Sequence, residues 1–182
     1  IRMNGIKVYY GEILSEHAEH ELEDEHLSFL LCATDNYYYN ALVCKAQGHE
    51  FGHHRTFQLA PHLESDMKHK RLTLQQRGYF SFEKTTDFYT LQQRLTEGWT
   101  VQTTRLSKDF DLERLQSRLG KLGEDWILLG CVSAQGELKI YSCEQRFKPT
   151  LGWTLLYFAD ESKVMLTDEK ADKPPRETEA GV

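Results

Sequence analysis

The sequence predicts an α+β fold with a mixed, mostly antiparallel sheet and two or three short helices. Three observations support this prediction. A helix–turn–strand pattern occurs twice in the second half of the chain. Short apolar segments alternate with clusters of turn-forming residues, which is typical of strands and short helices. At 40% hydrophobic and 12% aromatic residues, a chain of 182 residues can also bury a sizeable core.

The repeated pattern runs from Asp87 to Trp99 and again from Asp111 to Trp126. Asp, Leu, Gln, Arg and Leu recur at a constant offset, so we interpret the two copies as a duplicated unit that shares one sheet. Leucines lie three or four residues apart in both copies, which predicts one buried face on each helix. These leucines are Leu91 and Leu95 in the first copy, and Leu112, Leu115 and Leu119 in the second.

The remaining elements follow from local patterns in chain order. The acidic segment Ser15 to His26 is predicted to be a solvated loop or a frayed helix. Asp35-Asn36 is predicted to be the turn of a hairpin. The first repeat helix is expected to be capped by Thr86-Asp87 and to end at Gly98. The second is expected to be capped by Asp109 or Asp111 and to end near Gly120 to Gly123. Strands are expected at residues 6–10, 27–34, 37–44, 55–59, 79–83, 99–106, 126–132, 138–143 and 151–159.

Changes in composition divide the chain into four parts. Residues 1–60 form a β-rich N-terminal segment, and residues 61–78 form a polar connector. Residues 79–166 contain the duplicated α/β unit with its closing strands. Residues 167–182 combine charges with prolines and are predicted to be a disordered tail.

The repeat region carries a family resemblance. In the second copy Glu124-Asp125-Trp126 joins the helix to an apolar strand, and in the first copy Glu97-Gly98-Trp99 does the same. Over residues 87–144 this pattern resembles small, uncharacterised bacterial α/β domains with a helix–(Glu-Gly-Trp)–strand arrangement. The resemblance implies a fold and a bacterial origin, and it implies no activity.

The segment His49-Glu50-Phe51-Gly52-His53 resembles the zincin motif. Two histidines four residues apart on a helix can bind one zinc ion, and the glutamate between them can act as general base. Two glycines argue against this arrangement, because Gly48 and Gly52 disfavour a helix. We therefore predict that the segment does not form one continuous helix. A zinc-dependent hydrolase with ligands His49 and His53 and base Glu50 is kept as the alternative.

A further interpretation of the same region is a structural metal site. It would use His49, His53 and His54, together with His17 or His20. His17 and His20 are three residues apart and would share a helix face.

Two pairs of residues are candidates for binding. Tyr37 and Tyr39 would lie on one face of the predicted strand, where tyrosines can form a binding surface. Arg94 and Arg118 occupy the same position in the two repeat helices and could bind an anion. The competing interpretations are edge-strand packing for the tyrosines and solvation for the arginines.

Charge, hydropathy and cysteine content exclude several classes of function. A formal net charge of −6 argues against a nucleic-acid or anionic-membrane binder. No apolar run approaches the roughly 20 residues that span a bilayer. The four cysteines form no C-x-x-C pair, which favours free thiols in a reducing, cytoplasmic setting.

These observations predict a small cytosolic, non-catalytic interaction or regulatory domain of bacterial type. A protein partner or self-association is expected, and no nucleic acid or membrane is expected. No cofactor is expected either, whereas the alternative hydrolase would require zinc.

Overall fold

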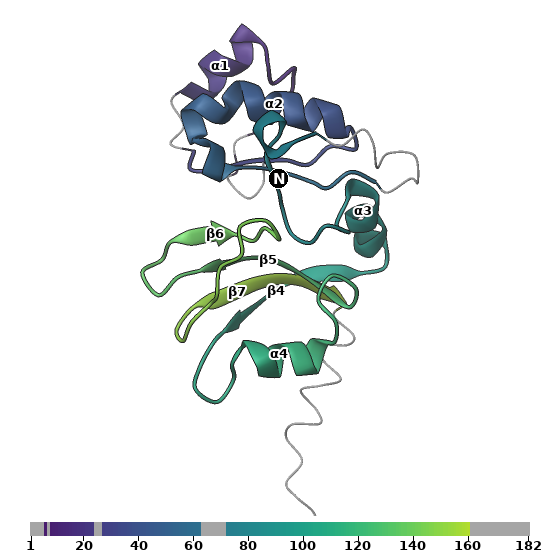
Figure 1. The fold of residues 1–182 in the computed structure, drawn as a ribbon, viewed down its shortest axis with the longest axis vertical. Coiled ribbons are helices and arrows are strands. Elements are labelled where there is room, and N and C mark those ends of the chain that lie inside the picture. The colour runs from purple at the N-terminus through teal and green to yellow at the C-terminus, as the bar shows by residue number, and fades with distance from the viewer. Residues whose placement is uncertain (1–5, 7, 24–26, 63–71, 161–182) are drawn as a thin grey trace, which may run out of the picture. The chain divides into compact units, whose positions relative to one another are not determined.

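The computed structural model describes residues 6, 8–23, 27–62 and 72–160 (Figure 1). The chain forms two compact units. Unit 1 comprises residues 1–88 together with Ser142–Gln145, and unit 2 comprises Tyr89–Tyr141 and the residues from Arg146. Unit 1 contains a parallel sheet and unit 2 an antiparallel sheet, so the predicted α+β class is confirmed. Residues 79–88, which the sequence places with the repeats, belong to unit 1.

The sheet of unit 1 consists of β1 (Leu30–Cys32), β2 (Thr56–Gln58) and β3 (Tyr79–Phe80), in the order β1-β2-β3. Both neighbouring pairs are parallel. Parallel neighbours require a crossover connection. Between β1 and β2 that connection contains helix α2 (Tyr37–Phe51), so these three elements form a βαβ unit.

The predicted hairpin at residues 27–44 is wrong, because Asn36 begins a helix instead of completing a turn. Its side chain accepts a hydrogen bond from the Tyr39 backbone N–H, which is a helix N-cap contact. The buried side chains then recur at helical spacing, with Tyr37, Ala41 and Cys44 on one side of α2. Asn is common both in turns and at N-caps, so the pair of residues alone does not distinguish the two.

The rest of unit 1 is made of shorter elements. The acidic segment contains α1 (Glu16–Glu23), and two short 3-10 helices, His53–Arg55 and Leu74–Gln76, precede β2 and β3. The strand predicted at residues 6–10 does not form in the described part of that segment. The predicted tail and residues 63–71 of the polar connector lie outside the described residues.

Unit 2 contains a four-stranded sheet with the order β4-β7-β5-β6, in which all neighbours are antiparallel. Its strands are β4 (Trp99–Arg105), β5 (Trp126–Val132), β6 (Leu138–Ile140) and β7 (Thr154–Asp160). The strands of the two repeat copies, β4 and β5, flank β7 on either side. Trp99 pairs with Asp160 and Trp126 pairs with Ala159, so both copies enter the sheet at almost the same level. The prediction that they share one sheet is confirmed.

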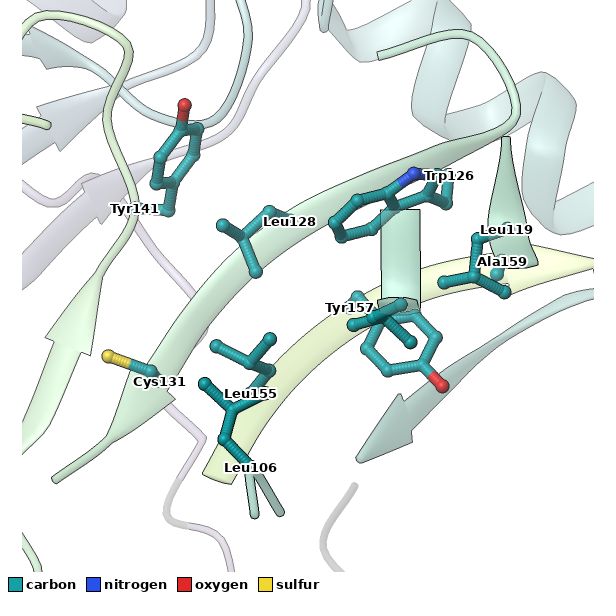
Figure 2. Close-up of a cluster of buried hydrophobic side chains, with 10 residues drawn as sticks. Leu106, Leu119, Trp126, Leu128, Cys131, Tyr141, Leu155, Tyr157 and Ala159 are labelled. Atoms are coloured by element: carbon teal, nitrogen blue, oxygen red, sulfur yellow. The ribbon is translucent and has the colours of Figure 1, made fainter. Parts of the chain in front are cut away.

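Two helices accompany this sheet, α3 (Phe88–Thr96) and α4 (Leu112–Leu119). Figure 2 shows the core to which α4 contributes. Trp126 is fully buried there, meets the Tyr157 ring edge-on at a centroid distance of 5.8 Å, and donates from Nε1 to the Gly120 carbonyl oxygen at 3.0 Å. Members of this cluster include Leu106, Leu115, Leu119, Leu128, Cys131, Leu155 and Ala159.

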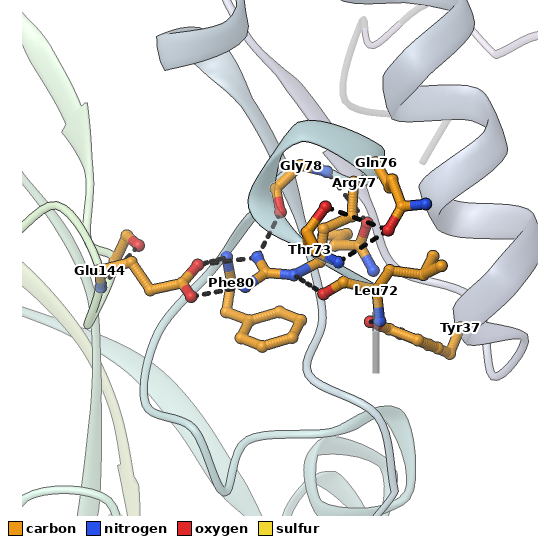
Figure 3. Close-up of polar contacts among 10 residues, drawn as sticks. Tyr37, Leu72, Thr73, Gln76, Arg77, Gly78, Phe80 and Glu144 are labelled. Carbon is orange, nitrogen blue, oxygen red and sulfur yellow. Dashed lines mark hydrogen bonds and ion pairs between the residues drawn. The ribbon is translucent and has the colours of Figure 1, made fainter. Parts of the chain in front are cut away.

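Contacts of Glu144 anchor the short segment 142–145 to the rest of unit 1 (Figure 3). Its carboxylate forms a bidentate ion pair with Arg77, at 2.6 and 2.8 Å, and accepts a hydrogen bond from the Phe80 N–H at 2.8 Å. Burial opposes ionisation of this carboxyl, but these bonds outweigh it and hold its pKa below the usual range. The Arg77 guanidinium also lies 3.7 Å from the centre of the Phe80 ring.

Candidate functional site

The candidate site lies where the three parallel strands of unit 1 end. Because parallel strands run in one direction, the loops that follow them lie at the same edge of the sheet. These loops begin at Ala33 after β1, Leu59 after β2 and Ser81 after β3. In open α/β sheets ligands bind outside the carboxyl ends of the strands. This edge is therefore the place in unit 1 where a ligand site is expected.

A hydrogen-bonded pair of side chains joins two of these loops. His62, in the loop after β2, places Nδ1 2.5 Å from Oδ2 of Asp87, in the loop after β3. The Asp87 side chain is only 9% exposed, whereas that of His62 is 55% exposed. A buried carboxylate requires a charged or hydrogen-bonding partner, and His62 supplies it. The pair thus presents a carboxylate backed by an imidazole that reaches solvent.

The loop after β1 is held rigidly by its own side chains. Thr34 Oγ1 donates to Asn40 Oδ1 at 2.6 Å, and Asn40 Nδ2 donates to the Thr34 carbonyl oxygen at 2.9 Å. Asn40 is almost completely buried in the first turn of α2. Because its amide satisfies both donor and acceptor groups of Thr34, the path from β1 into α2 is fixed before any ligand binds.

The loop after β3 contains two energetically unfavourable features. Phe82 has φ of 65°, and it is the one non-glycine residue with positive φ in the described part of the chain. Its carbonyl oxygen accepts from the Cys143 N–H at 2.9 Å, which helps to hold this conformation. The Thr86 hydroxyl is fully buried and has no hydrogen-bond partner among the described residues. Such strain and such unpaired groups concentrate at functional sites.

The residues predicted as zinc ligands do not share one helix. His49 and Glu50 lie in the last turn of α2, whereas Gly52 ends this helix with φ of 79°. His53 belongs to the following 3-10 helix. The prediction of a broken helix is therefore correct at Gly52 and wrong at Gly48, which lies inside α2. Without a shared helix face, the zincin arrangement of two imidazoles and one glutamate is not formed.

Two kinds of feature do not occur in the described residues. No group of three or more His, Cys, Asp or Glu side chains there could hold a metal ion. Of the histidines predicted for a structural metal site, His17 packs against the Tyr9 ring and His53 against the Tyr79 ring. No helix in the same ranges is both long and apolar enough to cross a membrane.

The predicted tyrosine surface needs correction, because it depended on the hairpin. Tyr37 is buried in α2, packs against Phe80 and accepts a hydrogen bond from the Leu72 N–H at 3.1 Å. Tyr39 lies on the same helix, and its hydroxyl donates to the carboxylate of Glu12. Tyr37 therefore contributes to the core, and a binding role for Tyr39 stays a prediction.

Arg94 and Arg118 each lie over an aromatic ring. Arg94 is 4.6 Å from the Trp99 ring centre, and Arg118 is 5.8 Å from that of Phe110. Arg94 also forms an ion pair with Glu97 at 2.9 Å. The equivalent arginines of the two copies thus cover apolar rings, and their role in anion binding stays a prediction.

His62 and Asp87 were not among the site residues predicted from the sequence. Asp87 resembled a helix cap, and His62 lay in the polar connector. A signal was nevertheless present, because each follows a segment that was predicted as a strand. The two residues can be placed side by side only if those strands are known to be parallel, because only parallel strands bring the loops that follow them to the same edge of the sheet.

Comparison with known proteins places this chain in no family. No family model matches it, and no curated protein matches it. Among solved structures, the GsuK channel bound to NAD aligns at 15% identity over 90% of this chain and 31% of its own, with a TM-score of 0.33. The GsuK RCK domain aligns at 15% identity over 91% of this chain and 38% of its own, also with a TM-score of 0.33. The chain thus spans about a third of the length of these proteins, and similarity at this level transfers neither ligand nor partner.

Proposed function

We propose that this chain is a non-catalytic regulatory domain that binds a small, hydroxyl-bearing ligand at the carboxyl edge of β1-β2-β3. The observation that carries this proposal is the His62–Asp87 pair, which joins two loops at that edge. A carboxylate held in place by a second side chain accepts hydrogen bonds from ligand hydroxyls with little loss of entropy. The pre-ordered turn at Thr34 and Asn40 supplies a rigid neighbouring loop.

The turn between β1 and α2 favours a ligand that is recognised through hydroxyls instead of phosphates. Dinucleotide-binding folds hold the pyrophosphate at a glycine-rich version of this turn. Here the turn has no glycine between Cys32 and Tyr37, and it carries the acidic Asp35. The Asn36 side chain also accepts a hydrogen bond from the Tyr39 N–H, one of the groups at the helix N-terminus that would otherwise face a phosphate. Asp87 adds a second acidic group, which favours hydroxyl or amine donors.

The local hydroxyl groups support a binding role over catalysis. Ser81 and Ser142 are fully buried, and Ser81 Oγ donates to the Gln58 carbonyl oxygen at 3.0 Å. Ser142 Oγ accepts from the Glu144 N–H at 3.1 Å. A nucleophilic hydroxyl has to reach both a base and the substrate. These two are engaged within the protein instead.

Exposed apolar side chains in unit 2 support the regulatory part of the proposal. Leu95 on α3 and Val101 on β4 are both well exposed. β4 is also an edge strand of its sheet, and edge strands can pair with another chain. We expect this region to contact a protein partner or a second copy of the chain. Light scattering of the purified chain, compared with Val101→Lys, tests self-association.

The ligand proposal is tested by the thermal shift and NMR spectra of the chain with three probes: adenosine, NAD and zinc. Adenosine carries ribose hydroxyls without phosphate, NAD carries both, and zinc tests the hydrolase alternative. We expect adenosine to raise Tm and to shift backbone resonances near His62 and Asp87. A ligand at about 100 times its Kd stabilises a protein by about 2.7 kcal/mol.

Two matched variants localise the effect. His62→Gln replaces the imidazole that contacts Asp87 and should abolish most of the adenosine response. His54→Gln changes an exposed histidine just before β2, at the opposite end of that strand, and should leave the response intact. Equal losses in both variants, or no response to either nucleoside-containing probe, would contradict the proposed site. Stoichiometric zinc binding would favour the hydrolase alternative.

A further inference from the structure

Two cysteines of unit 1 lie in contact within its core. Cys32 is the last residue of β1, and Cys44 lies in the middle of α2. Their Sγ atoms are 3.5 Å apart, and the residues are 8% and 2% exposed. Although all four cysteines are free thiols, this is the one thiol–thiol contact found among the described residues. Local residue patterns do not reveal this contact, because the two residues are 12 positions apart and both were predicted to lie in strands.

The surroundings hold the two sulfur atoms against each other. The Cys44 thiol also lies 3.4 Å from the Phe57 carbonyl oxygen, to which it can donate. Gly78 also lies against the Cys44 sulfur, because an added Cβ there would come within 2.7 Å of Cys44 Sγ. Val43 and Leu30 are among the apolar residues that pack around the pair. Absence of a side chain at Gly78 therefore leaves the space that the Cys44 sulfur occupies.

We propose that Cys32 and Cys44 form a reversible disulfide when the protein is exposed to hydrogen peroxide. One thiolate attacks a peroxide oxygen and the O–O bond breaks. That sulfur then carries a hydroxyl group, and the other peroxide oxygen leaves as hydroxide, which takes up the proton lost by that thiol and becomes water. The second sulfur then attacks the first, the S–S bond forms, and hydroxide leaves and takes up a proton. Two thiols and one peroxide thus give one disulfide and two water molecules, with the peroxide as the two-electron oxidant.

The geometry requires only a small adjustment. A disulfide has an S–S length of about 2.0 Å, so the present 3.5 Å separation must shorten by about 1.5 Å, shared between two side chains. The thiols also differ in acidity. The hydrogen-bond contact with Cys32 holds the pKa of Cys44 below its ordinary value against the effect of burial, while the same contact raises the pKa of Cys32. One sulfur of the pair is thereby favoured as the thiolate that reacts.

The other two cysteines provide an internal contrast. Burial raises the pKa of Cys131 to about 11, and burial likewise raises the pKa of Cys143. Neither has a thiol neighbour among the contacts of the described residues. A disulfide at Cys32 and Cys44 would close the loop that contains the Asn36 cap and the Thr34–Asn40 turn, and would restrain both. This inference is independent of the proposed ligand.

The proposal is tested on the full, reduced chain by titration with hydrogen peroxide, followed by alkylation of free thiols and peptide mapping by mass spectrometry. We expect a peptide pair linked through Cys32 and Cys44, a mass decrease of about 2 Da for the two hydrogens removed, and reversal by a thiol reductant. The same titration in urea should give a mixture of pairings, because the contact exists only in the folded chain.

Variants separate this outcome from unspecific oxidation. Cys143→Ser should leave the cross-link unchanged, whereas Cys44→Ser should abolish the 2 Da decrease and leave Cys32 open to alkylation or over-oxidation. If Cys44→Ser does not fold, the comparison of the native chain with its urea-unfolded form still decides the question. The proposal is overturned if folded and unfolded chains give the same pairings, or if Cys32 and Cys44 in the folded chain stay reduced while Cys143 is oxidised.

Discussion

The two copies of the helix–turn–strand unit in unit 2 share their residue pattern but differ in burial. On α4, Leu115 and Leu119 are buried and Leu119 is only 8% exposed. On α3, Leu95 occupies the position equivalent to Leu119 and is 62% exposed, and none of the residues of α3 is buried. Identical leucine spacing therefore leads to a core helix in one copy and to a largely exposed helix in the other.

The difference originates in what surrounds each helix. The leucines of α4 belong to the cluster that contains Trp126 and Tyr157, the central side chains of the antiparallel sheet (Figure 2). In the first copy the equivalent tryptophan, Trp99, packs against Phe158 and is covered by the Arg94 guanidinium. Leucine spacing specifies which side chains share a helix face. Whether that face is buried depends on the side chains of the sheet against which the helix packs.

Truncation of the equivalent leucines gives the largest expected contrast. We expect Leu119→Ala to lower the free energy of unfolding by about 2–4 kcal/mol, because it leaves a cavity in the core. Leu95→Ala should change it by less than about 0.5 kcal/mol, because that side chain is mostly in water. Urea unfolding followed by tryptophan fluorescence measures this directly, since all three tryptophans lie in unit 2. Similar losses in both variants would show that α3 is covered after all.

The glycines that end the two helices give a second, smaller contrast. Gly98 and Gly120 have φ of 87° and 93°, where an alanine costs about 1–2 kcal/mol. An added Cβ at Gly98 meets nothing within 4 Å, whereas at Gly120 it comes within 2.6 Å of Asp125 Oδ2. Gly120→Ala should therefore destabilise more than Gly98→Ala. The same fluorescence experiment ranks the two, and an equal effect would mean that Asp125 moves aside at no cost.

Local signals in the sequence were sufficient for the elements of unit 2. The repeat helices and β5 were predicted within a residue or two, because leucine spacing, glycine at helix ends and an apolar run all act within one element. The topology of unit 1 could not be predicted in this way, because local signals do not distinguish a hairpin turn from a helix N-cap at Asn36. Asn36 caps a helix instead of forming a turn, and this one difference turns an antiparallel hairpin into a parallel βαβ unit.

The candidate site could not be predicted for the same reason. His62 and Asp87 are 25 positions apart and meet because β2 and β3 are parallel. Cys32 and Cys44 likewise meet because α2 packs back on β1. Contacts of this kind depend on strand direction and on helix packing, which residue patterns within one segment do not encode.

The ion pair of the first copy provides the smallest contrast between the two copies. Hydrogen bonds from Arg94 and then Gln93 hold the pKa of the exposed Glu97 carboxyl below its ordinary value. A lowered pKa in the folded state means that this contribution to stability is complete above the ordinary pKa of Glu. It is lost as pH falls through the lowered value. We expect Arg94→Gln to raise the pKa of Glu97 towards its ordinary value.

An NMR titration of the Glu97 side-chain carboxyl measures this change. Arg118→Gln, at the equivalent position of the second copy, is the matched control and should leave the Glu97 titration unchanged. Because the pair is exposed, added salt should reduce the shift in the unaltered chain. A Glu97 titration that is the same with and without Arg94 would mean that the arginine acts only through its contact with the Trp99 ring. The two equivalent arginines would then have the same role, each as a cover for an aromatic side chain.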